Sequence, residues 1–168
     1  MVNKLKSRPV FVGALVLALL ALTVFANDWP QAPTADDMLA DDTVSDAIDD
    51  AWDDSDAGDK DKRHEEGGWI LWCRQQHGSE WQYSFKVVRV ASGGRSGITP
   101  GNPPEQENCR VVGFFHTHPN PPTDEDGDNW EQGPSESDNN WHNRHKIPGV
   151  VRNASGNETF GPERGYYE

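Results

Sequence analysis

The chain is poor in cysteine, in methionine and in positive charge. Its 168 residues include two cysteines, two methionines and 15 lysine and arginine residues, against 28 aspartate and glutamate residues. With a formal net charge of −13, the protein lacks the excess of basic residues that supplies most of the affinity for nucleic acids and for anionic membranes. The composition therefore argues against partners of these two classes, and solubility is a sufficient reason for the acidic surface.

Long apolar runs are also scarce, and the clearest one lies at the N-terminus. Three basic residues among the first eight precede an uncharged stretch over residues 10–25, and Ala26 stands before a polar segment. A basic region, an apolar core and small residues before a polar break are typical of a secretory signal peptide. This stretch is shorter than a membrane-spanning helix, which needs about 20 apolar residues. We predict cleavage after Ala26 and export of the rest, periplasmic or secreted, with an uncleaved membrane anchor as the alternative.

Residues 27–62 are strongly acidic but contain a helical pattern. Apolar residues recur there at i, i+3, i+4, i+7 and i+8, namely Val44, Ala47, Ile48, Ala51 and Trp52. This spacing predicts an amphipathic helix that docks by its apolar stripe, with Thr43 and Asp46 capping its start. A disordered acidic tail is the alternative.

A hairpin is predicted after residue 63, where the pattern becomes β-like. The apolar run over 69–74 and the alternating run over 81–90 flank a turn-like segment. Alternation of this kind indicates two paired strands with one buried face. The residues expected on that face are Trp81, Tyr83, Phe85 and Val87.

The remaining segments complete one small domain over residues 63–168. A Gly/Pro-rich loop over 91–108 leads to a strand that begins at Cys109, and a second loop runs from Asn120 to Pro134. Ser135 begins a helix that ends before Pro148, and a last hairpin follows. We predict an α/β (α+β) fold with a small mixed, mainly antiparallel sheet flanked by helices.

Two histidines stand where the central strand ends. His116 and His118 follow the apolar run 109–115 and are followed by prolines. Residues i and i+2 of a strand face the same way, so both imidazoles can reach one metal ion. Neutral imidazoles are common zinc ligands, but a catalytic zinc site needs a third ligand and an open position. By itself this pair also fits two polar surface residues.

The surrounding motifs extend this pattern. Glu65 stands at the start of the first strand, and Ser135 and Asp138 form a Ser-x-x-Asp arrangement downstream of the His-x-His-Pro motif. In this order, the three elements resemble the JAMM (MPN+, or JAB-like) zinc metalloproteases, in particular a secreted bacterial branch of that family. The resemblance covers about residues 65–151 and implies a JAB-like fold.

The resemblance also implies the roles of individual residues. His116, His118 and Asp138 would bind Zn²⁺, with water in the fourth position. Such an ion lowers the pKa of its bound water to about 7 and polarises the scissile carbonyl. Ser135 would donate a hydrogen bond to the developing oxyanion. Ser135 and Asp138 also suit the N-cap and N3 positions of a helix, and the two roles are compatible.

The base is implied to be a glutamate, and two neighbouring residues compete for this role. "EEGG" matches the Glu-x-x-Gly of family members as Glu65 to Gly68, which favours Glu65 over Glu66. Because neighbouring strand residues point to opposite faces, only one of the two carboxylates can point at the zinc.

Two features depart from the pattern or lie outside it. The loop from Asn120 to Pro134 has 15 residues, whereas family members have about seven, so the extra acidic residues would border the metal and affect substrate access. His142 and His145 stand three apart on the predicted helix, a spacing that also suits metal ligation, and we assign them to its surface.

The two cysteines provide an independent geometric check. Cys73 lies eight residues after Glu65, and Cys109 lies seven before His116. At about 3.3 Å per residue, both lie roughly 23–26 Å from the same end of the sheet. Neighbouring strands would bring them level, which is compatible with a disulfide; two reduced core thiols are the alternative.

The sequence therefore predicts an exported zinc-dependent hydrolase of amide or isopeptide bonds. Its substrate would be a peptide, an isopeptide-linked protein or a cell-wall crosslink. A catalytically inactive JAB-like binding or scaffold domain and a secreted effector domain are the alternatives.

Overall fold

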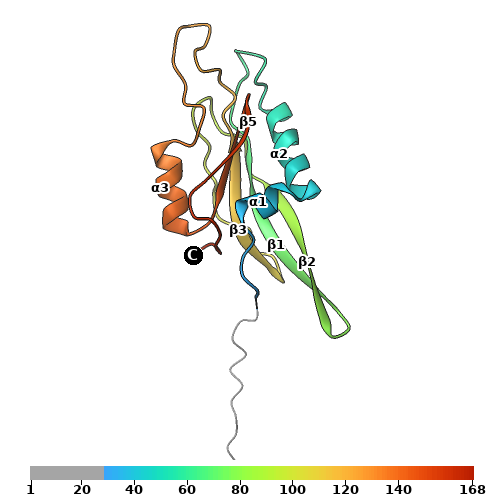
Figure 1. Cartoon of the computed structure of the whole chain (residues 1–168). Helices are drawn as coiled ribbons and strands as arrows, with labels where there is room; N and C mark the ends of the chain where they lie inside the picture. The colour runs from blue at the N-terminus through green and yellow to red at the C-terminus, as the bar shows by residue number, and fades with distance from the viewer. Residues whose placement is uncertain (1–28) are drawn as a thin grey trace, which may run out of the picture.

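The computed structural model describes residues 29–168, and the predicted signal peptide lies outside this range. In chain order the elements are α1 (Ala35–Leu39), α2 (Asp42–Asp54), β1 (Gly67–His77), β2 (Glu80–Arg89), β3 (Cys109–Thr117), α3 (Glu136–His145), β4 (Gly149–Asn153) and β5 (Gly156–Phe160). Figure 1 shows a central sheet with α2 on one face and α3 on the other. From residue 29 onward, no helix is long and apolar enough to cross a membrane.

The five strands form one sheet in the order β2-β1-β3-β4-β5. Only the β3–β4 pair is parallel among the named strands, and α3 makes the crossover between these two. The predicted α+β class with a mixed, mainly antiparallel sheet is therefore confirmed. Both predicted hairpins are present, as β1–β2 and β4–β5.

Each face of the sheet carries its own apolar cluster. On one face α1 and α2 pack against the sheet, with Met38 and Ile48 fully buried beside Phe115. On the other face Trp69, Leu71, Phe114 and Ile147 pack together, with Trp141 of α3 against them. Since α1 and α2 share a core with the strands, the acidic N-terminal segment and the sheet form one packed unit.

The helix predicted in the acidic segment is present as α2, and Val44, Ile48 and Ala51 of its stripe are buried. The predicted cap is wrong, because Asp41 caps this helix by accepting a hydrogen bond from the Thr43 backbone N–H. The short preceding helix α1, which begins after Thr34, was not predicted.

Trp81 is a second correction. It was expected on the buried face of the hairpin, but it is 41% exposed. The guanidinium of Arg74 lies over its ring, 4.5 Å from the centroid. This part of β2 lies near the hairpin turn, and Trp81 is supported there by a cation–π contact instead of by a core.

Cys73 and Cys109 form a disulfide between β1 and β3. They are direct register partners with Cα atoms 4.0 Å apart, so the expectation that they lie level is confirmed. The register shifts by one residue between Ile70 and Leu71, where β3 is irregular around Val112. This irregularity is a β-bulge, in which two residues of one strand oppose one residue of its partner.

The opposite end of the same strand pair carries the histidines. There Gly67 of β1 pairs with His116 of β3. A Cβ atom on Gly67 would lie 2.6 Å from the carbonyl oxygen of Phe115. Only glycine permits this close approach, which places the residues just before β1 beside the end of β3.

Candidate metal and catalytic site

His116 and His118 bring two imidazole nitrogens together at the end of β3. His116 is inside the strand, whereas His118 follows it and donates its backbone N–H to the carbonyl of Arg152, at 2.8 Å. Their Nε2 atoms are 3.1 Å apart. Both side chains are largely buried, so these two nitrogens are shielded from bulk solvent.

Asp138 of α3 points its carboxylate at the same two nitrogens. Its Oδ2 atom lies 3.6 Å from Nε2 of His116 and 3.9 Å from Nε2 of His118. The same oxygen accepts hydrogen bonds from the backbone N–H of Ser135 at 2.8 Å and from its hydroxyl at 2.6 Å. Ser135 and Asp138 form a capping box at the start of α3. The helix cap therefore holds this carboxylate in place beside the histidines.

This arrangement of donors fits a zinc ion. In a tetrahedral site with bonds of about 2.0–2.2 Å, ligand atoms lie roughly 3.3–3.6 Å from one another. The three separations between the donor atoms of His116, His118 and Asp138 are 3.1, 3.6 and 3.9 Å. Two imidazoles and one carboxylate also make a donor set that catalytic zinc uses.

The electrostatics favour the forms that bind metal. Burial, followed by the neighbouring His116, lowers the pKa of His118 to about 4, so its imidazole is neutral near pH 7. Burial alone would raise the pKa of Asp138, but His116 and the hydrogen bonds from Ser135 hold it well below its usual value. A neutral imidazole and an ionised carboxylate are the ligand forms that a divalent metal requires.

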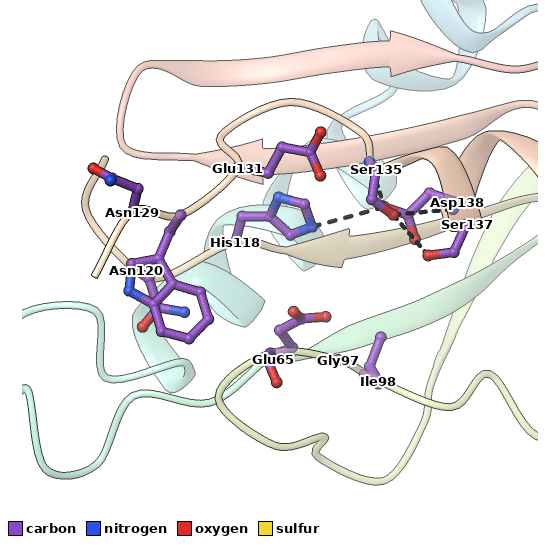
Figure 2. A pocket seen from close by; sticks show the side chains of 12 residues that line it. Glu65, Gly97, Ile98, His118, Asn120, Asn129, Glu131, Ser135, Ser137 and Asp138 are labelled. Atoms are coloured by element: carbon purple, nitrogen blue, oxygen red, sulfur yellow. Dashed lines mark hydrogen bonds and ion pairs between the residues drawn. The ribbon is translucent and has the colours of Figure 1, made fainter. Parts of the chain in front are cut away.

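Glu65 approaches the histidines from another segment. One carboxylate oxygen and the ring nitrogens of His116 and His118 all lie within 4.8 Å of one another. The backbone of Glu65 is fixed on both sides, since its N–H donates to Gly94 at 2.8 Å and its carbonyl accepts from Gly93 at 2.7 Å. In Figure 2 its side chain lies below the imidazole of His118, across the cavity from Asp138 and Ser135.

Burial raises the pKa of Glu65 to about 7. The negative charge of Asp138 acts in the same direction, while His116 opposes it. A carboxyl group with a pKa near neutral pH is suited to take up a proton and to give it back.

Glu66 lies on the other face and in a different environment. Its carboxylate accepts hydrogen bonds from Arg89 Nη2 at 2.6 Å and from the hydroxyl of Ser92, and it lies 2.9 Å from Nε2 of His64. Burial would raise its pKa, but these three partners together hold it below its usual value. Of the two competing glutamates, only Glu65 is in the group with the histidines.

Ser135, expected to contact an oxyanion, is engaged with protein groups. Its Oγ donates to Asp138 and accepts from the backbone N–H of the same residue, at 3.1 Å. The Oγ of Ser137 lies 2.8 Å from it. Ser137 also lines the cavity, and its hydroxyl is a second potential donor that the sequence reasoning did not single out.

A cavity of about 360 Å³ opens beside these groups. Besides Glu65, His118 and Asp138, its lining includes Asn120, Trp130 and Glu131 from the long loop after β3. The predicted proximity of this loop to the histidines is therefore confirmed, and Figure 2 shows Glu131 close to His118.

The long loop is held in place by a buried carboxylate. Asp124 accepts hydrogen bonds from Arg95 at 2.7 Å, from the indole of Trp130 at 2.8 Å and from two backbone N–H groups of the loop at 3.0 Å. Glu125 forms a two-point ion pair with Arg63, with both N–O distances at 3.0 Å. The loop is therefore a fixed wall of the cavity.

His142 and His145 lie outside this group. The assignment of His142 to the surface is wrong: it is 2% exposed, its Nδ1 lies 3.1 Å from the carbonyl of Ile147, and burial lowers its pKa to about 4. His145 is partly exposed and stacks on Tyr167 with ring centroids 4.8 Å apart.

No protein-family model matches the chain, and neither the curated proteins nor the solved structures contain a match to it.

Proposed function

We propose that the protein is an exported, zinc-dependent hydrolase of amide or isopeptide bonds, a metallopeptidase of the JAMM type. The observation that carries this proposal is the convergence of His116, His118 and Asp138 on one point, with the carboxyl of Glu65 buried beside it. The order of the motifs and the mixed sheet between helices are both compatible with a JAB-like fold.

His116, His118 and Asp138 are the proposed zinc ligands. When bound, zinc would lower the pKa of a coordinated water to about 7 and polarise the scissile carbonyl. Glu65 is the alternative third ligand, because it also lies within reach of both histidines. Asp138 is the better candidate because its pKa is lowered, so it is ionised before a metal arrives, whereas the raised pKa of Glu65 suits proton transfer.

In the proposed reaction Glu65 takes a proton from the attacking water and passes it to the nitrogen of the leaving amine. Both forms of its carboxyl are accessible near pH 7 because burial has raised its pKa to about 7. The amine would otherwise leave as an unstable anion. On the opposite side of the cavity the hydroxyl of Ser137 is the candidate donor to the oxyanion. Ser135, the residue expected in this role, would take it only by releasing the hydrogen bond that its hydroxyl donates to Asp138.

Export is supported by two independent features. The first 26 residues have the composition of a signal peptide. In the described part of the chain, Cys73 and Cys109 form a disulfide, and such bonds persist mainly in oxidising compartments.

Metal analysis and a cleavage assay test the proposal. The protein lacking residues 1–26 should bind about one zinc per chain, and the His118→Ala variant should lose it. A peptide library, with products identified by mass spectrometry, should be cut by the wild-type protein and not by Glu65→Gln. Zinc binding without cleavage of any amide or isopeptide bond would favour the scaffold alternative, and absence of zinc would overturn the proposal. An effector would share this chemistry and differ in its target.

A further inference from the structure

A second cavity of about 200 Å³ lies against the proposed metal ligands. It shares Ile98, Ser137 and Asp138 with the larger cavity, and His116 also lines it. The larger cavity is bordered by carboxylates and amides, whereas four of the eight residues that line this one are apolar, namely Ile98, Pro100, Phe114 and Trp141. The buried His142 completes its wall. The two cavities therefore meet at the proposed metal centre and differ in chemistry.

The walls of the apolar cavity are preformed. The ring of Trp141 packs against Phe114, Trp69 and His145, with centroids 5.9, 5.8 and 4.6 Å apart. On the loop side, the carbonyl of Pro100 accepts a hydrogen bond from the indole of Trp69 at 3.0 Å. Because neither wall has to be ordered when a ligand binds, such a cavity loses little affinity to conformational entropy.

The size of the cavity defines its occupant. An apolar cavity of about 150 Å³ can hold benzene, so about 200 Å³ accommodates a leucine or phenylalanine side chain. A charged side chain would lose its hydration in this cavity. Among the described residues that line it, Asp138 is the one acidic group, and its carboxylate would be bound to the metal.

The position of Glu65 defines which side of the scissile bond lies in which cavity. Glu65 lines the larger cavity and not the apolar one. Since Glu65 would protonate the leaving amine, the amine side of the substrate lies in the larger cavity. The residue that contributes the scissile carbonyl then extends the other way, past Asp138 and Ser137.

We propose that the apolar cavity is the subsite for the side chain on the carbonyl side of the scissile bond, and that it selects a leucine- to phenylalanine-sized apolar residue. This inference rests on the proposed function for its orientation. The substrate class is thus a peptide bond that follows a large apolar residue.

Ligand binding to a protein that cannot turn over gives a test independent of catalysis. Zinc-loaded Glu65→Gln protein is titrated with N-acetyl-leucinamide and with N-acetylglycinamide by ligand-observed NMR. We expect the leucine compound to bind about ten- to a hundredfold more tightly, which is the usual effect of burying one such side chain. Equal binding, or no detectable binding of either compound, would overturn the subsite.

Variants of Ile98 locate the effect. Ile98→Phe in the same background should fill the cavity and reduce the preference for leucine at least fivefold. Ile98→Ala should enlarge the cavity and favour N-acetyl-phenylalaninamide over the leucine compound. Val90→Ala is the matched control, because Val90 packs in the apolar cluster of this face without lining the cavity. A leucine preference that neither Ile98 variant changes would place the binding elsewhere and overturn the assignment.

The peptide library separates this inference from the proposed function. Cleavage mainly after leucine, methionine or phenylalanine supports both. Cleavage that occurs equally after glycine and after apolar residues supports hydrolysis and overturns the subsite. Leucine-selective binding without any cleavage supports the cavity as a ligand site and overturns the hydrolase.

Discussion

The two ends of the β1–β3 strand pair differ in how they are held. At one end, Cys73 and Cys109 join the strands covalently, and the rings of Trp29, Trp72 and Tyr83 pack nearby with centroids 4.7–6.1 Å apart. At the other end, titratable side chains lie next to one another, and their burial disfavours the charged form of some of them. Burial raises the pKa of Glu65 to about 7 there and lowers that of His118 to about 4.

Under the proposed function, this difference assigns stability to one end and chemistry to the other. Buried groups with shifted pKa values reduce the stability of the metal-free protein, and they are common at functional sites. A crosslink far from the site stabilises the register without entering the chemistry. Changes at the two ends should therefore have opposite consequences, and the following predictions test this, from the largest expected effect to the smallest.

Replacement of Glu65 should remove activity and leave the fold intact. Glu65→Gln should lower the rate of amide hydrolysis about 10²–10⁴-fold, the usual contribution of a general base, with unchanged zinc content. Glu66→Gln is the matched control: it loses part of its interaction with Arg89 and should cost about 1–3 kcal/mol of stability, with turnover retained. Rate assays and urea titrations of both variants measure the two effects. The opposite pattern would assign the base to Glu66.

Removal of the disulfide should lower the stability of the protein and leave its activity intact. The double variant Cys73→Ser with Cys109→Ser should lose about 2–4 kcal/mol of unfolding free energy, since the bond closes a loop with a sequence separation of 36 residues. Below its melting temperature the variant should bind zinc and turn over substrate as the wild type does. Loss of zinc from the folded variant would mean that the two ends are coupled.

In the metal-free protein, the contribution of Glu65 to stability should fall as the pH rises from about 4.5 to 7, while the lowered pKa values of His118 and His142 act in the opposite direction. The pKa of Glu65 is about 7 in the folded state and 4.5 in the unfolded chain, so the unfolded chain releases this proton first as the pH rises. The stabilising contribution of the protonated group is full below pH 4.5 and is lost by about pH 7. Urea titrations with chelator at pH 4.5, 6 and 8 should show a decline of roughly 1–3 kcal/mol relative to Glu65→Gln. An identical pH dependence in both proteins would contradict the raised pKa.

The smallest effect is expected for the cap that holds Asp138. Ser135→Ala should cost about 1 kcal/mol of stability and weaken zinc binding about 10–100-fold, since the residue orients a ligand. Thr34→Ala is the matched control, because Thr34 forms the same capping box at the start of α1, away from the histidines. Competition with a chelator should show weaker zinc binding in the first variant only. Equal zinc affinity in both would reduce Ser135 to a helix cap.

Local pattern predicted the strands and the helices over residues 42–54 and 136–145, because each has a clear period or a clear cap. It did not predict the exposure of Trp81, since alternation assigns a residue to a face but does not say how far the covering layer extends. It also missed the burial of His142. The helix around it has little apolar character, and the burial depends on Phe160, whose ring lies 4.6 Å away, and on the carbonyl of Ile147.

The candidate site was predicted as a set of residues but not as a geometry. Alternation along an extended strand separates Glu65 from Glu66, but it does not say which of them faces the histidines. That outcome depends on the pairing of Gly67 with His116 and on the hydrogen bonds of Glu65 with Gly93 and Gly94. The hydrogen bond from Arg95, in the loop before β3, to Asp124, in the long loop after β3, joins two distant segments. Such a contact has no local signal in the sequence.

The β-bulge around Val112 determines the side of the sheet on which the histidines lie. Cys109 and Val111 face the α3 side with the odd-numbered residues of β3, yet beyond the bulge the even-numbered Phe114 and His116 take over that side. With strict alternation from Cys109 onward, both imidazoles would point toward α2, away from Asp138. The number of residues between Cys109 and His116 therefore matters. Loss or gain of one residue in this segment would turn both histidines to the opposite side of the sheet, whereas a change of two residues would preserve their direction.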